Sequence, residues 1–139
     1  MILLLLVDTL QAESPRFTLQ INGNQSAGAT LYLAIYPADS DDWQAEAHQN
    51  LKRVLPDTEQ VQWPLDLPAG RYAIKAFVDL NHNGQLDRKN RRTPLEPFAF
   101  SLGDGRDKPG ISFNKAVFTL DGEHTTARLP LQYPKQRAR

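Results

Sequence analysis

The stretch from Arg71 to Asp87, RYAIKAFVDLNHNGQLD, constrains this chain more than any other part of the sequence. Its first half alternates, with Tyr72, Ile74, Ala76 and Val78 on one side, which is typical of a strand that buries one face. Its second half places oxygen-bearing side chains at every second position, followed by Gly84, which lets the chain turn sharply. The stretch therefore predicts a β-strand that ends in a polar loop.

Side-chain oxygens at alternate positions are also the arrangement that a calcium-binding loop requires. We predict that this loop binds Ca²⁺. The predicted ligands are Asp79, Asn81 and Asn83 through their side chains, Gln85 through its carbonyl, and Asp87 directly or through water. Further oxygens are expected from Glu96, Asp104 or Asp107 if the loops meet.

Two features of the sequence lower the affinity that we expect of this site for Ca²⁺. An EF-hand loop would require a bidentate Glu where this chain has Asn90, and four basic residues (Arg88, Lys89, Arg91 and Arg92) crowd the next positions. We therefore expect a dissociation constant in the weak extracellular range, roughly 10⁻⁴–10⁻³ M. The alternative is a metal-free polar turn, in which the Asn residues and the Gly satisfy the backbone.

Length and composition limit the number of domains and the kinds of partner and site that this chain can have. A chain of 139 residues is long enough for one domain with a core. Sixteen basic residues balance sixteen acidic ones, so no global field would attract nucleic acid or an anionic membrane. The absence of cysteine excludes disulfides, thiolate metal sites and cysteine nucleophiles.

The remaining strands are predicted from the same two-residue period. Phe17–Asn22 and Leu31–Tyr36 alternate and resemble a hairpin joined by a polar, glycine-containing connection. Val61–Leu65 contains Pro64, which predicts an edge strand or a bulge. The C-terminal half adds three more short strands, around Phe98–Leu102, Ala116–Leu120 and Ala127–Leu131.

Residues 39–53 are the one helical candidate, because Trp43, Ala47 and Leu51 are four residues apart. We expect a short helix or an irregular excursion there, with Trp43 used for packing. About seven short strands with turns at this spacing predict an all-β, single β-sandwich.

The ends of the chain carry two further expectations. Ile2–Val7 is an unbroken apolar run followed by polar sequence, so residues 1–12 resemble a secretory signal peptide, although no basic residue precedes the run. Residues 13–134 would form the sandwich domain and 135–139 a basic tail. The predicted location is therefore periplasmic or secreted.

Three blocks of this sequence, LPAGRYAIKAFVDLNHNGQLD, TPLEPFAFS and SFNKAVFTLDGE, resemble the DUF2141 family of uncharacterised secreted bacterial proteins. The resemblance runs from about Phe17 to Tyr133 and implies an immunoglobulin-like or prealbumin-like sandwich, exported and without an assigned activity. The loop is also similar to calcium loops in the B-type repeats of bacterial surface adhesins. The basic residues after Asp87 and the charged segment 103–109 depart from the family pattern.

The functional expectation is a non-enzymatic envelope module that binds a protein or a glycan, or serves as a scaffold. The alternative is a hydrolase or lyase that acts on an anionic substrate through loop carboxylates and the basic cluster. A carboxylate pair of Glu96 with Asp79 or Asp87 is the corresponding catalytic candidate. The three histidines lie in separate segments and Ser101 has no recognisable base beside it, so neither predicts a relay.

Overall fold

The computed structural model describes residues 16–86, 88–89, 93–103 and 111–134. Short strands and two 3₁₀ turns make up these ranges, so the all-β prediction is confirmed. The elements are β1 (Phe17–Asn22), β2 (Thr30–Pro37), η1 (Ala38–Ser40), β3 (Gln49–Val54), β4 (Val61–Leu65), β5 (Gly70–Asp79), β6 (Arg88–Lys89), β7 (Thr93–Pro94), β8 (Phe98–Phe100), η2 (Phe113–Ala116), β9 (Phe118–Leu120) and β10 (Thr126–Pro130).

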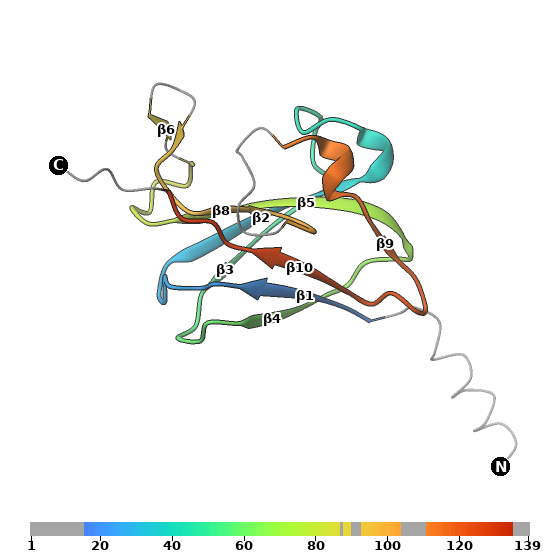
Figure 1. Cartoon of the computed structure of the whole chain (residues 1–139), viewed down its shortest axis with the longest axis horizontal. Helices are drawn as coiled ribbons and strands as arrows, with labels where there is room; N and C mark the ends of the chain where they lie inside the picture. Colours follow the sequence, from blue (N-terminus) through green and yellow to red (C-terminus); the bar gives the residue numbers. More distant parts are fainter. Residues whose placement is uncertain (1–15, 87, 90–92, 104–110, 135–139) are drawn as a thin grey trace, which may run out of the picture.

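Two sheets are packed face to face, which confirms the predicted sandwich (Figure 1). The small sheet has the order β10–β1–β4, and the large sheet has the order β3–β2–β5–β8. β5 is long enough to pair with two strands along one edge, first with β9 at Gly70–Tyr72 and then with β8 at Lys75–Phe77. The strand with the clearest alternation in the sequence is therefore a central strand of the large sheet.

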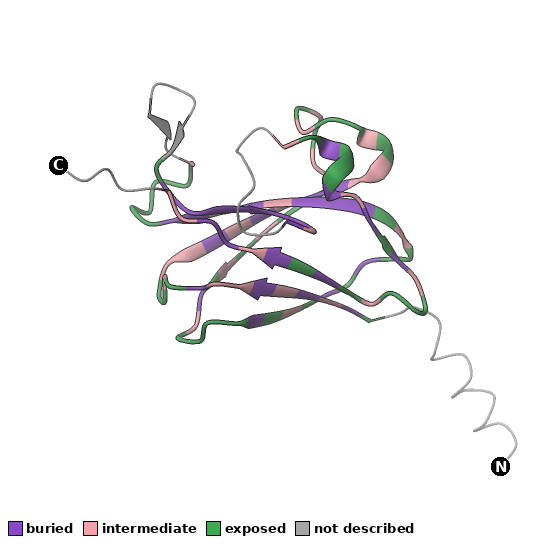
Figure 2. Ribbon diagram, in the orientation of Figure 1, coloured by how far each residue is buried: buried purple, intermediate pink, exposed green. Residues whose placement is uncertain are grey.

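The core fills the space between the two sheets (Figure 2). Every second residue of each central strand points into it, as the two-residue period requires. Phe17, Leu19 and Ile21 of β1 are completely inaccessible, and Ile74 and Val78 of β5 face them. Each large apolar side chain buried in this way contributes about 1.5–3 kcal/mol to folding. These side chains fix the register of both sheets, because a slip of one residue would expose them.

A second apolar cluster lies on the outer face of the large sheet, under the segment around η1 and under η2. Trp43 packs against the rings of Tyr36, Phe100 and Phe113, with centroids 5.3, 5.3 and 4.8 Å away. Its indole N–H donates to the carbonyl of Ile111 (3.0 Å). The prediction that Trp43 serves packing is confirmed.

The predicted pairing of Phe17–Asn22 with Leu31–Tyr36 is wrong. β1 pairs in parallel with β10 and antiparallel with β4, whereas β2 pairs with β3 and β5 in the other sheet. The connection crosses from one sheet to the other instead of forming a hairpin. Both segments are strands, as predicted, and their buried faces meet across the core.

Residues 39–53 divide into two parts, and neither is an α-helix. Residues 38–48 form the irregular excursion that was the second expectation, beginning with η1. Gln49–Val54 is β3, an edge strand of the large sheet, so the helix prediction is wrong there. The prediction for Pro64 is confirmed, because β4 lies at the edge of the small sheet.

Residues 1–12 and 135–139, the predicted leader and tail, lie outside the described residues. Within the described ranges, no helix has the length and apolar character needed to cross a membrane.

Candidate functional site

Asp79, the last residue of β5, is the structural centre of the candidate loop. It is only 1% exposed, and it pairs with Thr30 of β2, two residues beyond Phe77. Its Oδ1 accepts a hydrogen bond from the N–H of Asn83 (3.2 Å), and its Oδ2 accepts one from the N–H of Gly84 (2.7 Å). These hydrogen bonds hold the backbone of the loop against the end of β5.

The two asparagines repeat this pattern on a smaller scale. Oδ1 of Asn81 accepts from the N–H of Asn83 (3.3 Å), and Oδ1 of Asn83 accepts from the N–H of Gln85 (3.0 Å). Both asparagines are exposed, yet their oxygens turn toward the backbone of the loop instead of outward into water. Three of the five predicted ligands thus present side-chain oxygens to one short segment.

Two backbone conformations make this curvature possible. Gly84 has φ of 75°, the left-handed region that glycine adopts without cost, as the sequence predicted. His82 also has a positive φ, 62°, which is uncommon for a residue with a Cβ. In the sequence, only its position between two asparagines of the loop distinguishes His82.

Asp79 remains a carboxylate despite its burial. Burial by itself raises its pKa, but hydrogen bonds from the N–H groups of Gly84, Asn83 and His82, with the charge of the His82 side chain, together outweigh that effect. The pKa of Asp79 therefore lies below its ordinary value of 3.8. The loop is organised around a negative charge that persists at neutral pH.

Glu96 reaches the same loop from the other side, as expected if the loops meet. It is 3% exposed, and its Oε2 accepts from the N–H of Leu80 (2.6 Å). Two carboxylates thus bind backbone N–H groups of this loop: Glu96 binds that of Leu80, and Asp79 binds those of Asn83 and Gly84.

Other predicted site residues are not placed. Asp87, Asp104, Asp107, Arg91 and Arg92 lie outside the described residues, and for Arg88 and Lys89 only the backbone of β6 is described. Within the described part of the chain, no group of three or more His, Asp or Glu side chains gathers as a metal cluster.

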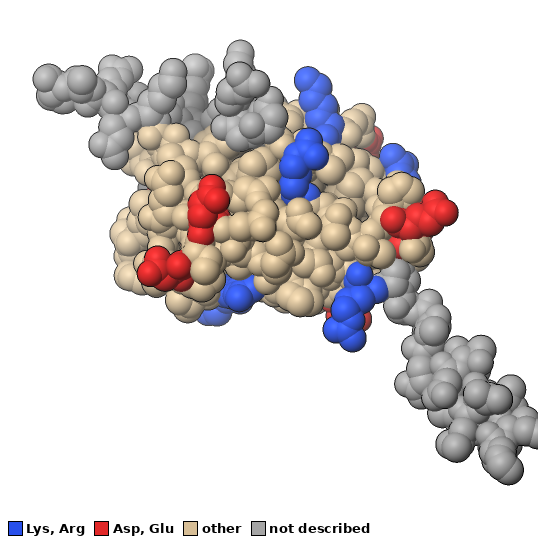
Figure 3. Space-filling view, turned by 60° about the horizontal axis from the view of Figure 1, so that its bottom comes forward, with Lys and Arg blue, Asp and Glu red and all other residues tan. Residues whose placement is uncertain are grey.

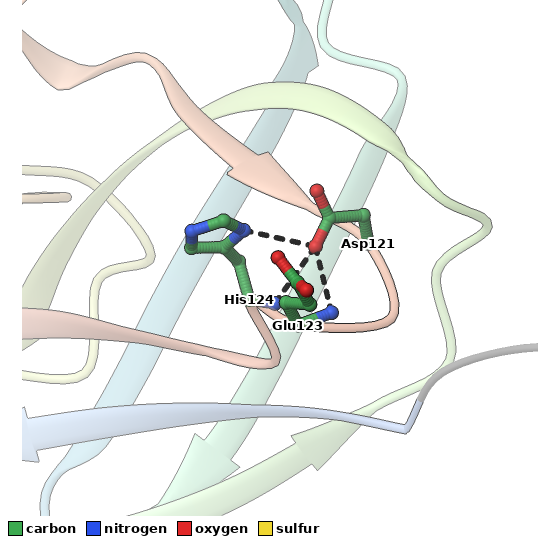
Figure 4. A network of polar contacts seen from close by, with 3 residues as sticks. All are labelled: Asp121, Glu123 and His124. Atoms are coloured by element: carbon green, nitrogen blue, oxygen red, sulfur yellow. Dashed lines mark hydrogen bonds and ion pairs between the residues drawn. The ribbon is translucent and has the colours of Figure 1, made fainter.

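A second aspartate organises the turn between β9 and β10 (Figure 4). Oδ1 of Asp121 accepts from the N–H groups of Glu123 and His124, each at 2.8 Å, and lies 2.9 Å from Nδ1 of His124. These contacts, led by the Glu123 N–H and the His124 ring, set the pKa of Asp121 below its ordinary value. The side chains of His124 and Asp121 are 63% and 45% exposed, so this network lies in solvent.

Ser101 stabilises the fold through two hydrogen bonds. It is fully buried, its Oγ accepts from the N–H of Ile74 (3.0 Å), and its hydroxyl donates to the carbonyl of Ala116 (2.6 Å). The serine joins β5 to η2 beneath the second apolar cluster. Both hydrogen-bonding functions of the hydroxyl are thereby used inside the protein.

The loop also forms one end of a groove on the outer face of the large sheet. The groove has a volume of about 510 Å³, and Gly84 and Leu86 line it together with side chains of β2, β5 and β8. Neither Asp79 nor Glu96 lines it. No pattern in the sequence predicted this groove.

Charge on another face of the molecule is dispersed (Figure 3). Basic and acidic side chains of the described residues are interspersed there, and neither sign covers the face in this view. This face therefore presents no field of one sign.

Comparisons with known proteins give one result. A comparison with curated proteins and another with solved structures each found no match. The sequence model of a family described as "Uncharacterized protein conserved in bacteria (DUF2141)" matches residues 19–128, which cover both sheets and the Asp79 loop. This chain therefore belongs to the DUF2141 family.

Proposed function

We propose that this protein is an exported, non-enzymatic β-sandwich module of the bacterial envelope whose Asp79–Asp87 loop is a weak structural Ca²⁺ site. The observation that carries the proposal is the buried Asp79 carboxylate, which stays ionised at the centre of a loop with inward-turned asparagine oxygens.

The chemistry of the loop suits a hard cation. The two oxygens of the Asp79 carboxylate have about four lone pairs, and they accept backbone hydrogen bonds from His82, Asn83 and Gly84. Carboxylate and amide oxygens are the ligands that Ca²⁺ takes, and Asp79, Asn81 and Asn83 turn such oxygens toward one short segment of the loop. Few of these ligands are charged, so the affinity is weak, with a dissociation constant of roughly 10⁻⁴–10⁻³ M.

A binding or scaffold role is supported by the arrangement of the carboxylates. Asp79 and Glu96 bind the backbone of the loop and do not line the groove next to it. A hydrolase would instead place them where a substrate could reach them. The proposal of export rests on the leader-like residues 1–12, and the expected partner is a protein or a glycan of the envelope.

Thermal melting with and without cation tests the Ca²⁺ site. We expect 5 mM CaCl₂ to raise the melting temperature, because a ligand that binds only the folded state stabilises it. Asp79→Asn should abolish this shift, and the control Asp121→Asn should retain it. The same concentration of MgCl₂ should have a smaller effect, since Mg²⁺ demands near-ideal octahedral geometry.

The metal-free polar turn is the alternative that this experiment can establish. No calcium-dependent shift in the wild type, or an equal shift in Asp79→Asn, would show that the loop is held by its own hydrogen bonds alone.

A further inference from the structure

The outer face of the large sheet carries an ordered grid of side chains between the loop and the second apolar cluster. Antiparallel pairing aligns Lys52, Tyr32, Phe77 and Phe98 in one row. The next row consists of Asn50, Ala34, Lys75 and Phe100. Residues that are directly opposite in register share a face, so both rows project on the same side of the sheet.

The groove follows the second row because Ala34 is small. Tyr32 and Phe77 stack on one side of it, with ring centroids 5.0 Å apart and planes 6° from parallel. Tyr36 stands on the other side, packed edge-on against Trp43 (5.3 Å, 82°). Phe98 and Phe100 line the groove from β8. The result is a slot with aromatic walls and a low floor at Ala34.

One ammonium group is held in this slot. Nζ of Lys75 lies 5.6 Å from the ring centroid of Tyr36 and 5.7 Å from that of Trp43, and it donates to the carbonyl of Trp43 (3.5 Å). These contacts position the charge without neutralising it. None of the described residues that line the groove is acidic. Its other polar side chains are Asn50, Tyr32 and Tyr36, and the Tyr36 hydroxyl donates to the carbonyl of Trp43 (3.2 Å).

We propose that this groove is a binding site for a small planar organic anion, an aromatic or conjugated ring that carries a carboxylate. The ring would lie between the aromatic walls over Ala34, and the carboxylate would accept a hydrogen bond from Lys75. The volume falls within the range of small-molecule sites, and few polar groups in a mostly apolar slot are typical of them.

This site goes beyond the proposed cation site, and it does not require that the loop binds Ca²⁺. The loop contributes Gly84 and Leu86 to one end of the groove, and Asp79 on the same sheet face is occupied by the loop backbone. The two proposals can therefore fail separately.

Binding of 2-naphthoate, measured by NMR titration in EDTA, tests the proposal. We expect shifts in the side-chain signals of Tyr32, Phe77 and Phe100, and an affinity at least about tenfold higher than for the neutral 2-naphthylmethanol. Cyclohexanecarboxylate, which has the charge but no planar ring, should bind more weakly than 2-naphthoate.

Two variants separate the contributions of charge and shape. Lys75→Met should reduce the affinity for 2-naphthoate about tenfold and leave 2-naphthylmethanol unchanged within twofold, while Lys115→Met, at η2 and outside the groove lining, should change neither. Ala34→Leu should block both naphthyl probes, and Thr18→Leu, on the outer face of the small sheet, should block neither.

Absence of binding at millimolar 2-naphthoate would overturn the proposal. Equal affinity of the wild type and Lys75→Met for 2-naphthoate would also overturn it, as would binding that persists in folded Ala34→Leu. Because the titration is run in EDTA, none of these results bears on the cation site.

Discussion

Two loops of this protein are each built around an aspartate, and they differ in where the aspartate lies. Asp79 is 1% exposed at the end of a central strand, whereas the side chain of Asp121 is 45% exposed in a turn between β9 and β10. Both accept backbone N–H groups from residues that follow them, and in both the pKa is lowered. Loss of the carboxylate should therefore destabilise the protein more at Asp79 than at Asp121. Water can replace the hydrogen bonds of the exposed Asp121 side chain but has little access to the Asp79 carboxylate.

Removal of each carboxylate should give the largest contrast. Asp79→Ala leaves the N–H group of Gly84 without its acceptor, and it leaves that of Asn83 with only Oδ1 of Asn81. We expect its melting temperature to fall by roughly 5 °C or more, and that of Asp121→Ala by under about 2 °C. Differential scanning calorimetry measures both, and equal shifts in the two variants would contradict the comparison.

The glycines in the two loops give the next contrast. Gly84 has φ of 75°, and an added Cβ would come no closer than 4.0 Å to the Tyr32 hydroxyl, so Gly84→Ala meets only backbone strain. We expect a loss of about 1 kcal/mol in the free energy of unfolding. Gly122 has ordinary backbone angles and open space around it, so Gly122→Ala should stay within about 0.5 kcal/mol of the wild type. Urea denaturation measures both values, and a cost at position 122 that matches the cost at 84 would rule out this explanation.

The pH dependence of stability sharpens the comparison further. The pKa of Asp79 is lower in the folded state than its ordinary value of 3.8. A lowered pKa stabilises the protein above the unfolded-state value, and the stabilisation disappears as pH falls through the folded-state value. Asp79→Asn should therefore be less stable than the wild type at pH 7, and the difference should shrink below about pH 4. Denaturation curves from pH 7 to pH 2 test this, and a constant difference would mean that the charge of Asp79 has no part in it.

The smallest expected effect concerns the His124 contact. Removal of the ring in His124→Ala should raise the pKa of Asp121 toward 3.8, because the ring donates to the carboxylate. The pKa should stay below 3.8, since the Glu123 N–H is the larger cause of its lowering. Carboxyl ¹³C NMR titration measures this shift, and an unchanged pKa would show that the ring contact contributes nothing.

The sequence predicted much of this fold because alternation reports which face of a strand is buried. That period correctly identified the inward residues of β1, β2 and β5. It does not report which strand lies alongside, so the polar connection after Asn22 was taken for a hairpin turn although β1 pairs with β10 and β4. β3 was missed because Leu51 is its only apolar residue besides the exposed Val54.

The same distinction explains the candidate sites. The loop was predictable because its oxygens and its glycine are close together in the sequence. Glu96 was expected to reach this loop only if the loops meet, and the sequence does not show its contact with Leu80. The groove depends on Ala34, Lys75 and Phe100, which are far apart in the sequence and are aligned only by strand register. No local pattern contains that information.

The central claim, that the Asp79 loop is a cation site and not only a polar turn, is tested most directly by NMR during a calcium titration. We expect the backbone and side-chain amide signals of Asn81, Asn83 and Gln85 to shift with a midpoint of roughly 10⁻⁴–10⁻³ M, while the signals of Glu123 and His124 stay in place. If both loops shift together, or if neither shifts at 10 mM, about ten times the upper bound of that range, the claim is contradicted.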